Sequence, residues 1–201
     1  MTEKEKMLNG KPYKAFGEEL KSERKYAKEM IFEYNNLSPK EINKHNEIIK
    51  RIFGRVGNDF YIEPPFRCDY GYNISAGKNF YVNYNCTILD CAEVTIGDNV
   101  MFAPNVSLFT AGHPIHFEAR NEFIEYAFPI SIGNNVWVGG GVIVNPGITI
   151  GNNVVIGSGS VVTKDIPSNC IAVGNPCKVI KQITDEDKQY YFKNLKFDNT
   201  I

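Results

Sequence analysis

Residues 130–166 read ISIGNNVWVGGGVIVNPGITIGNNVVIGSGSVVTKDI, and an aliphatic residue returns at every sixth position. One series consists of Ile132, Val138, Val144, Ile150, Ile156 and Val162. A second series at the same interval consists of Ile130, Val136, Val142, Ile148 and Val154. A helix repeats about every 3.6 residues and a strand about every two, so neither pattern alone explains a period of six.

Turn-forming residues occur at fixed places in this period. Glycine directly follows an aliphatic residue at positions 97, 133, 139, 151 and 157, and asparagine lies three past one at 99, 135 and 153. Both residue types tolerate positive φ, so each hexad predicts a short strand and a corner. Three hexads would close a triangular coil of about 18 residues, with coils stacked about 4.8 Å apart. The predicted fold class is an all-β parallel β-helix. A sandwich of short strands is the alternative, but its turns would vary in length.

The same period is present earlier in the chain and is interrupted once. It is carried by Val82, Ile88, Val94, Val100 and Val106, and by Ile96, Phe102 and Leu108. Residues 109–129 break it and contain two of the three histidines, yet Val106 and Ile130 remain in phase. We therefore expect a loop that protrudes from the coil, and loops on rigid scaffolds often carry function.

Three parts of the chain are expected. Residues 1–55 form an N-terminal helical segment, with helices over 17–35 and 38–53, the second starting at Ser38 and Pro39. Residues 56–182 form the β-helix with its loop. Residues 183–201 form a tail that packs on the coil or on a neighbouring subunit.

The composition excludes few classes of function. The 201 residues carry a net charge of −1, so there is no bulk attraction to nucleic acid or to a membrane. The N-terminus is charged from its third residue and shows no signal-peptide pattern, which favours a cytoplasmic protein. The five cysteines are odd in number and include no CxxC pair, so reduced thiols are expected and a zinc site is not.

With these motifs in view, the chain resembles the hexapeptide-repeat sugar O-acetyltransferases of the galactoside and maltose type. The resemblance rests on EKMLNGKPY (5–13), IEPPFRCDYGYNI (62–74), TAGHPIH (110–116) and IGNNVWVGGGVIVNPG (132–147). It implies a left-handed coil and a homotrimer. It also implies that acetyl-CoA lies between adjacent subunits as co-substrate and that a sugar hydroxyl is the acceptor.

A thioester is already activated, so the enzyme must chiefly make a hydroxyl nucleophilic. This calls for a base with a pKa near neutrality. His113 in TAGHPIH matches the family's catalytic histidine, and the backbone N–H of Gly140 matches its oxyanion donor. His116 is expected at the surface. Carbonic anhydrases of the γ type share this fold but need three histidines around zinc, and the third histidine here is His45 in the helical segment, so no metal is expected.

The resemblance also implies the binding residues. For coenzyme A they are Trp137, Gly140, Ser158, Thr163, Lys164, Lys178 and Lys181. For the acceptor they are Arg24, Asp69, Tyr81 and Asn83. Ala15 and Cys91 stand where the galactoside enzyme has aspartates, which predicts an altered acceptor preference.

Three alternatives remain open at this stage. The same histidine could serve an antibiotic acetyltransferase. Cys86 or Cys91 could form an acetyl-enzyme. The chain could also be a trimeric scaffold without activity, since fold alone does not fix function.

Overall fold

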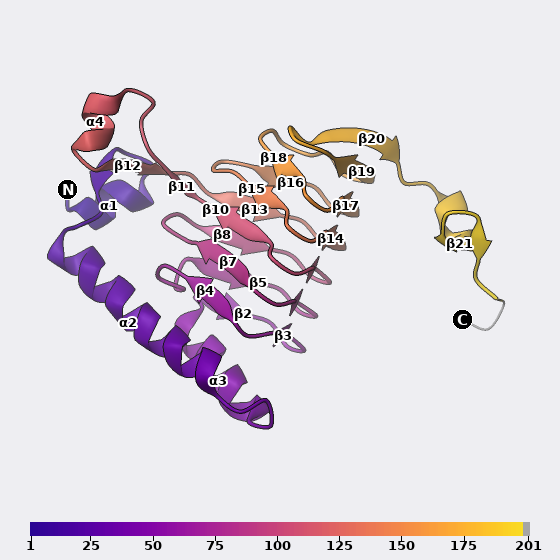
Figure 1. The fold of residues 1–201 in the computed structure, drawn as a ribbon, viewed down its shortest axis with the longest axis horizontal. Coiled ribbons are helices and arrows are strands. Elements are labelled where there is room, and N and C mark those ends of the chain that lie inside the picture. Colours follow the sequence, from indigo (N-terminus) through magenta and orange to yellow (C-terminus); the bar gives the residue numbers. More distant parts are fainter. Residues whose placement is uncertain (199–201) are drawn as a thin grey trace.

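The computed structural model describes residues 1–198, and its main body is a three-sided parallel coil (Figure 1). The first face contains β2 (Arg55–Val56), β5 (Ile74–Ala76), β8 (Val94–Ile96), β13 (Ile130–Ile132) and β16 (Thr149–Ile150). The second face contains β3 (Tyr61–Ile62), β6 (Tyr81–Val82), β9 (Met101–Phe102), β14 (Val136–Val138), β17 (Val154–Ile156), β19 (Cys170–Val173) and the antiparallel β20 (Lys178–Gln182). The third face contains β4 (Phe66–Cys68), β7 (Cys86–Leu89), β10 (Ser107–Phe109), β15 (Ile143–Val144) and β18 (Val161–Val162). The predicted parallel β-helix is confirmed.

The length of a turn differs between the two halves of the coil. In the later half Ile132 pairs with Ile150, 18 positions on, as the hexads predict. In the earlier half Ile74 pairs with Val94, 20 positions on, so the expectation of 18 throughout was wrong. The additional residues lie between the third and first faces, where the corners 69–73 and 90–93 are longer than a hexad corner.

The three edges of the coil differ in composition. The asparagine edge joins the first face to the second and has six residues with positive φ, namely Asp59, Asn79, Asn99, Asn135, Asn153 and Asn169. The glycine edge joins the second face to the third through 83–85, 103–105, 139–141 and 157–159. The loop edge joins the third face back to the first through 69–73, 90–93, the loop 110–129, 145–148 and 163–165.

Helices close the open end of the first turn. α2 (Glu18–Asn36) and α3 (Ile42–Ile52) bury Ile31 and Ile49 against the same core as Phe66 of the coil. Residues 38–41 form a turn in which the Glu41 N–H donates to the Ser38 carbonyl, and α3 begins only at Ile42. The prediction of a helix starting at Ser38 was therefore four residues early.

The protruding loop has its own structure. It contains β11 (Ala111–Gly112), α4 (Phe117–Asn121) and β12 (Ile124–Ala127), and β12 also pairs with β1 (Tyr13–Lys14), which follows α1 (Glu3–Leu8). At the other end, η1 (Asp185–Gln189), β21 (Tyr190–Phe192) and β22 (Leu195–Lys196) extend away from the coil (Figure 1).

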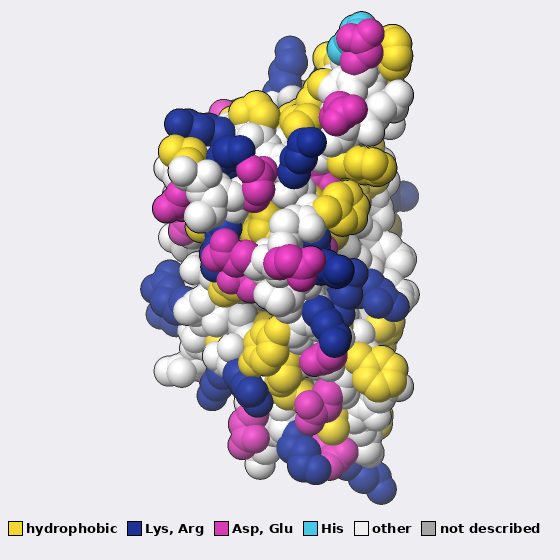
Figure 2. Space-filling view, turned by 90° about the vertical axis from the view of Figure 1, so that its left-hand side faces the viewer, with side chains coloured by type: hydrophobic (Ala, Val, Ile, Leu, Met, Phe, Trp, Pro, Cys, Tyr) yellow, Lys and Arg dark blue, Asp and Glu magenta, His cyan; other side chains and the backbone are white. Residues whose placement is uncertain are grey.

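The surface over the N-terminal helices shows acidic and basic side chains interspersed, with histidine visible only at the tip of the loop (Figure 2). Among residues 1–198, no helix is long and apolar enough to cross a bilayer.

Candidate active site on two edges of the coil

His113 follows β11 and is exposed on the loop. Its Nδ1 lies 3.1 Å from the carbonyl oxygen of Ile124. A carbonyl can only accept a hydrogen bond, so this contact places the ring hydrogen of a neutral imidazole on Nδ1. Nε2 then carries the free lone pair, which is the state a general base requires.

The base of the loop is held by β12, which pairs with β1 from the N-terminal segment and with β11 from the loop itself. Tyr13 of β1 lies opposite Glu125 of β12, and its hydroxyl donates to the Glu125 carboxylate at 2.7 Å. Across β12, Gly112 lies opposite Tyr126, and a side chain at position 112 would come within 3 Å of the Tyr126 ring. The strand that precedes His113 is therefore held by the N-terminal segment, and a larger residue at 112 would require the Tyr126 side chain to move.

A buried carboxylate organises the longer corner of the loop edge. Asp90 is fully buried and accepts backbone N–H bonds from Asp69, Tyr70 and Asn73 at 3.0, 2.9 and 3.3 Å. Burial raises the pKa of Asp90 to about 7, while the N–H donors act in the opposite direction. These bonds satisfy the corner backbone and thereby fix the position of Asp69.

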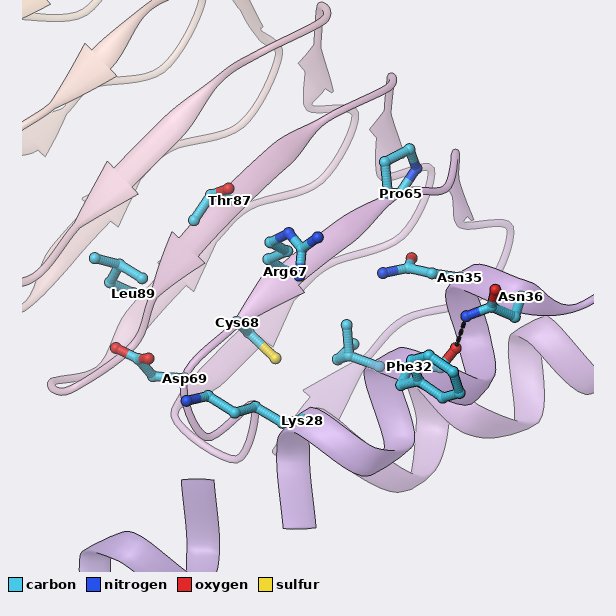
Figure 3. A pocket seen from close by; sticks show the side chains of 11 residues that line it. Lys28, Phe32, Asn35, Asn36, Pro65, Arg67, Cys68, Asp69, Thr87 and Leu89 are labelled. Atoms are coloured by element: carbon cyan, nitrogen blue, oxygen red, sulfur yellow. Dashed lines mark hydrogen bonds between the residues drawn. The ribbon is translucent and has the colours of Figure 1, made fainter. Parts of the chain in front are cut away.

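Asp69 lines a groove of about 550 Å³ between α2 and the third face (Figure 3). Lys28 and Phe32 approach from the helix, while Arg67 and Thr87 line it from β4 and β7. The predicted acceptor residue Asp69 thus borders a groove lined by both charged and apolar side chains.

The cysteines proposed as nucleophiles are poorly suited to that role. Cys91 is buried and its thiol donates to Asp69 Oδ2 at 3.5 Å, and burial raises the pKa of this thiol. Burial also raises the pKa of Cys86 to about 11. Because the thiolate is the reactive form, both groups are held in their unreactive state at neutral pH.

Arg24 lies near this corner and uses two of its five N–H donors within the fold. Its guanidinium donates to the Tyr70 hydroxyl and to the Ala15 carbonyl, which ties α2 to the loop edge. The predicted role of Arg24 in acceptor binding stays a prediction, and these contacts favour a supporting part.

The glycine edge carries the second group of predicted residues. Asn83, Gly140 and Ser158 lie on it. Gly140 and Ser158 are in successive turns, and the turn of 103–105 lies between Asn83 and Gly140. The Gly140 N–H, predicted as a free oxyanion donor, instead donates to Ser158 Oγ at 3.1 Å. That bond forms because Ser158 stacks directly over Gly139, where a Cβ would lie only 2.6 Å from the Ser158 nitrogen.

Large side chains line the second face beside the glycine edge. Trp137 is 51% exposed and is flanked in the sheet by Met101 and Val155. Tyr81 stacks on Tyr61 with ring centroids 6.1 Å apart. This outward column is apolar, unlike the outward positions of the first face, and it is available to cover a flat or apolar ligand segment or another chain.

The residues predicted to hold coenzyme A are divided between these regions. Thr163 and Lys164 lie exposed at the loop edge, and Lys178 and Lys181 lie on β20 of the second face. Lys181 is ion-paired with Asp187 of the tail. Within the part of the chain that the structure describes, Lys164 and Lys178 form no ion pair, so their charges are available to phosphate groups.

One chain does not bring the two groups together. His113 and Asp69 belong to the loop edge, whereas Asn83 and Gly140 belong to the glycine edge, and the whole third face lies between them. A strand advances about 3.3 Å per residue, so three or four residues of strand separate the edges by roughly 10–13 Å before the corners are counted. Atoms this far apart cannot act on one reacting bond.

His116 does not join either group. It is exposed on the loop, as expected, and its Nδ1 lies 3.7 Å from Glu118 Oε2. Within residues 1–198, no three histidine, cysteine, aspartate or glutamate side chains are grouped to hold a metal ion.

Sequence reasoning missed Tyr13, Asp90 and Glu125. Tyr13 and Glu125 are 112 positions apart, and nothing in a hexapeptide period predicts that they pair. Asp90 could have been suspected, because an acidic residue directly after a buried strand, at a corner, often caps backbone N–H groups.

Comparisons with known proteins give the family. The maltose acetyltransferase hexapeptide capping motif matches residues 6–57, and the six-repeat bacterial transferase hexapeptide matches residues 129–164. A galactoside O-acetyltransferase of Escherichia coli K12 is 49% identical over 98% of this chain and 97% of its own length. The chain belongs to the hexapeptide-repeat acetyltransferases.

Solved structures agree with this membership. A maltose O-acetyltransferase from Clostridium difficile 630 is 57% identical, with a TM-score of 0.91 over 92% of this chain and 99% of that one. A galactoside acetyltransferase solved in complex with coenzyme A is 49% identical, with a TM-score of 0.96 over 98% of this chain and 99% of that one. The predicted family is confirmed. In this acetyltransferase the capping motif covers α2 and α3, the helices that close the coil.

Proposed function

We propose that this protein transfers acetyl from acetyl-CoA to a sugar hydroxyl, with His113 as general base, in a homotrimer whose sites lie between subunits. The observation that carries the proposal is the Nδ1 contact of His113 with the Ile124 carbonyl, because it leaves Nε2 free to accept a proton. The coenzyme A complex of the galactoside relative and the names of both relatives support the donor and the acceptor class.

The separation of the two residue groups supports a site shared by two chains. If the loop edge of one subunit faces the glycine edge of its neighbour, His113 and Asp69 meet Asn83 and Gly140 across the interface. The exposed column that includes Trp137 would be covered in the same arrangement. A closed ring of three copies uses one such heterologous contact three times, which is the symmetry a trimer requires.

The reaction then follows from the residues. His113 Nε2 takes the proton of the acceptor hydroxyl as its oxygen bonds to the thioester carbonyl carbon, and the carbonyl oxygen becomes an oxyanion. Donors at the glycine edge stabilise that oxyanion. When the carbon–sulfur bond breaks, the imidazolium returns the proton to the departing thiolate, giving an acetyl ester and free coenzyme A.

The phosphates of coenzyme A suit the unpaired lysines Lys164 and Lys178, which act as point charges. Thr163 would add a hydroxyl contact beside Lys164. Lys181 must first give up Asp187 to contribute, so its share is expected to be smaller.

The acceptor is proposed to be a sugar other than a simple galactoside. Ala15 offers only its carbonyl, and that carbonyl already accepts from Arg24. Cys91 offers a buried thiol in place of a carboxylate. A site that relies on hydrogen bonds to hydroxyl groups loses much of its selectivity for a given sugar when such partners change.

The experiment is an acceptor panel of mono- and disaccharides with acetyl-CoA, read by release of free thiol. His113→Ala is expected to lower kcat by about 10²–10⁴ for every accepted sugar, since that is the usual contribution of a general base. His116→Ala, on the same loop, is the matched control and is expected to keep the parent rate. A His113→Ala rate within twofold of the parent would overturn the mechanism, whereas efficient acetylation of a thiogalactoside would overturn only the acceptor proposal.

A further inference from the structure

The backbone donors of the glycine edge are almost all used within the coil. The N–H groups of Gly139, Gly141 and Gly159 donate to the carbonyls of Ile156, Pro104 and Gly140. The Gly140 N–H donates to Ser158 Oγ at 3.1 Å. An N–H has a single hydrogen, so none of these four glycine groups is free for a ligand in this arrangement.

The Ser158 hydroxyl is placed differently. Its oxygen accepts from Gly140, its side chain is exposed, and its own hydrogen has no acceptor among the described residues 1–198. A hydroxyl that accepts an N–H bond is polarised by it and becomes a stronger donor through its own hydrogen. The Ser158 hydroxyl can therefore donate a hydrogen bond to a ligand at the edge where the thioester carbonyl is proposed to lie.

We propose that the Ser158 hydroxyl is a catalytic residue that donates to the oxyanion, with the Gly140 N–H held behind it as the group that orients and polarises it. This proposal rests on the proposed acetyl transfer. It changes the source of oxyanion stabilisation from the backbone of residue 140 to a side chain of the next turn. As the carbonyl oxygen gains charge, the Ser158 hydrogen bond to it shortens while the proton stays on Ser158.

A purely structural explanation must be separated from this one, because the asparagine edge contains the same hydrogen bond. There, the Asn152 N–H donates to Ser168 Oγ at 2.9 Å, and Ser168 stacks over Gly151 as Ser158 stacks over Gly139. A serine in this position can thus serve only to cap a corner. Ser168 lies on an edge that contains none of the proposed site residues, so it is a matched control for the loss of the bond itself.

The experiment compares Ser158→Ala with Ser168→Ala. Alanine keeps the backbone of residue 158 and removes only the hydroxyl. Both variants are expected to lower Tm by a similar small amount. Only Ser158→Ala is expected to lower kcat, by about 10- to 100-fold. The loss stays at or below that of a deleted oxyanion donor, because the freed Gly140 N–H takes over part of the role.

Two further readouts make the test specific to the oxyanion. The resemblance places Ser158 among the coenzyme A residues, and a hydroxyl used for that binding would raise the acetyl-CoA KM when removed. A hydroxyl that acts on the oxyanion instead leaves coenzyme A affinity and the acetyl-CoA KM of Ser158→Ala within twofold of the parent, and Ser158→Thr, which keeps a hydroxyl, is expected to recover most of the rate. A Ser158→Ala kcat that is within twofold of the parent, or higher, would overturn the proposal and return the role to the Gly140 N–H. If His113→Ala has no effect or no sugar is acetylated, the proposed function itself fails, and that result is distinct from the Ser158 outcome.

Discussion

The asparagine edge and the glycine edge are built from the same turn of the coil, yet they leave different groups free. On the asparagine edge, side chains bond along the stack, as in Asn79 to Asn99 at 2.8 Å and Asn99 to Asn135 at 3.1 Å. On the glycine edge, a Cβ at Gly141 or Gly159 would meet nothing within 4 Å. The polar groups of the asparagine edge hold the turns together. The glycine edge has open space and the exposed hydroxyl of Ser158.

From this difference we infer that the proposed chemistry and the bonds that stabilise the turns are divided by position around the coil. Asparagine and glycine both permit positive φ, so either satisfies the backbone at a corner. The side chain determines what occupies the edge. The asparagine amides form hydrogen bonds along it, whereas glycine leaves room for a ligand to approach.

Asn83→Ala on the glycine edge should give the largest effect of three substitutions that test this division. Asn83 is proposed to bind the acceptor, and loss of a hydrogen bond to substrate should lower kcat/KM for the sugar by about 10- to 100-fold. Steady-state kinetics at saturating acetyl-CoA would measure this. An unchanged acceptor kcat/KM with a lowered Tm would place Asn83 with the structural asparagines.

Lys164→Ala at the loop edge should give an intermediate effect. An exposed lysine that contacts a phosphate should raise the acetyl-CoA KM by about 3- to 10-fold, with the difference shrinking at high salt. Lys78→Ala is the control, because Lys78 is an exposed lysine on the asparagine edge. If only the acceptor KM moves, Lys164 does not contact coenzyme A.

Asn99→Ala on the asparagine edge should have the smallest effect on activity and a clear one on stability. Asn99 has a φ of 56° and bonds to the asparagines above and below it. Its replacement should lower the free energy of unfolding by about 1–2 kcal/mol through strain in the left-handed region. Denaturant unfolding would measure this, and a kcat loss larger than twofold would contradict the division between the edges.

The hexapeptide period predicted the coil because it is a local pattern that each turn repeats. It did not predict the 20-residue turns. Ile88 and Val94 are six apart, as the hexads require, whereas the paired residues Ile74 and Val94 are 20 apart instead of 18. The additional corner residues form the part of the loop edge that holds Asp69 and Cys91. The departure from the period thus coincides with the corner at which the acceptor is proposed to bind.

The site was predictable only in part for a related reason. His113 and Gly140 lie in short motifs, so the resemblance could propose a role for each of them. The orientation of His113 depends on Ile124, and the loop beneath it depends on pairing between Tyr13 and Glu125. Contacts over such separations are set by tertiary packing, which a linear pattern does not encode. The bond from Gly140 to Ser158 also joins successive turns, and the motif gave no sign of it.

Complementation between two impaired variants tests the central claim most directly. His113→Ala and Asn83→Ala would be mixed in equal amounts, unfolded and refolded together. If each site takes His113 from one subunit and Asn83 from its neighbour, random trimers should recover about a quarter of the parent activity, because both intact edges then meet at one interface in four. Activity no higher than the average of the two single variants would contradict a site shared between subunits.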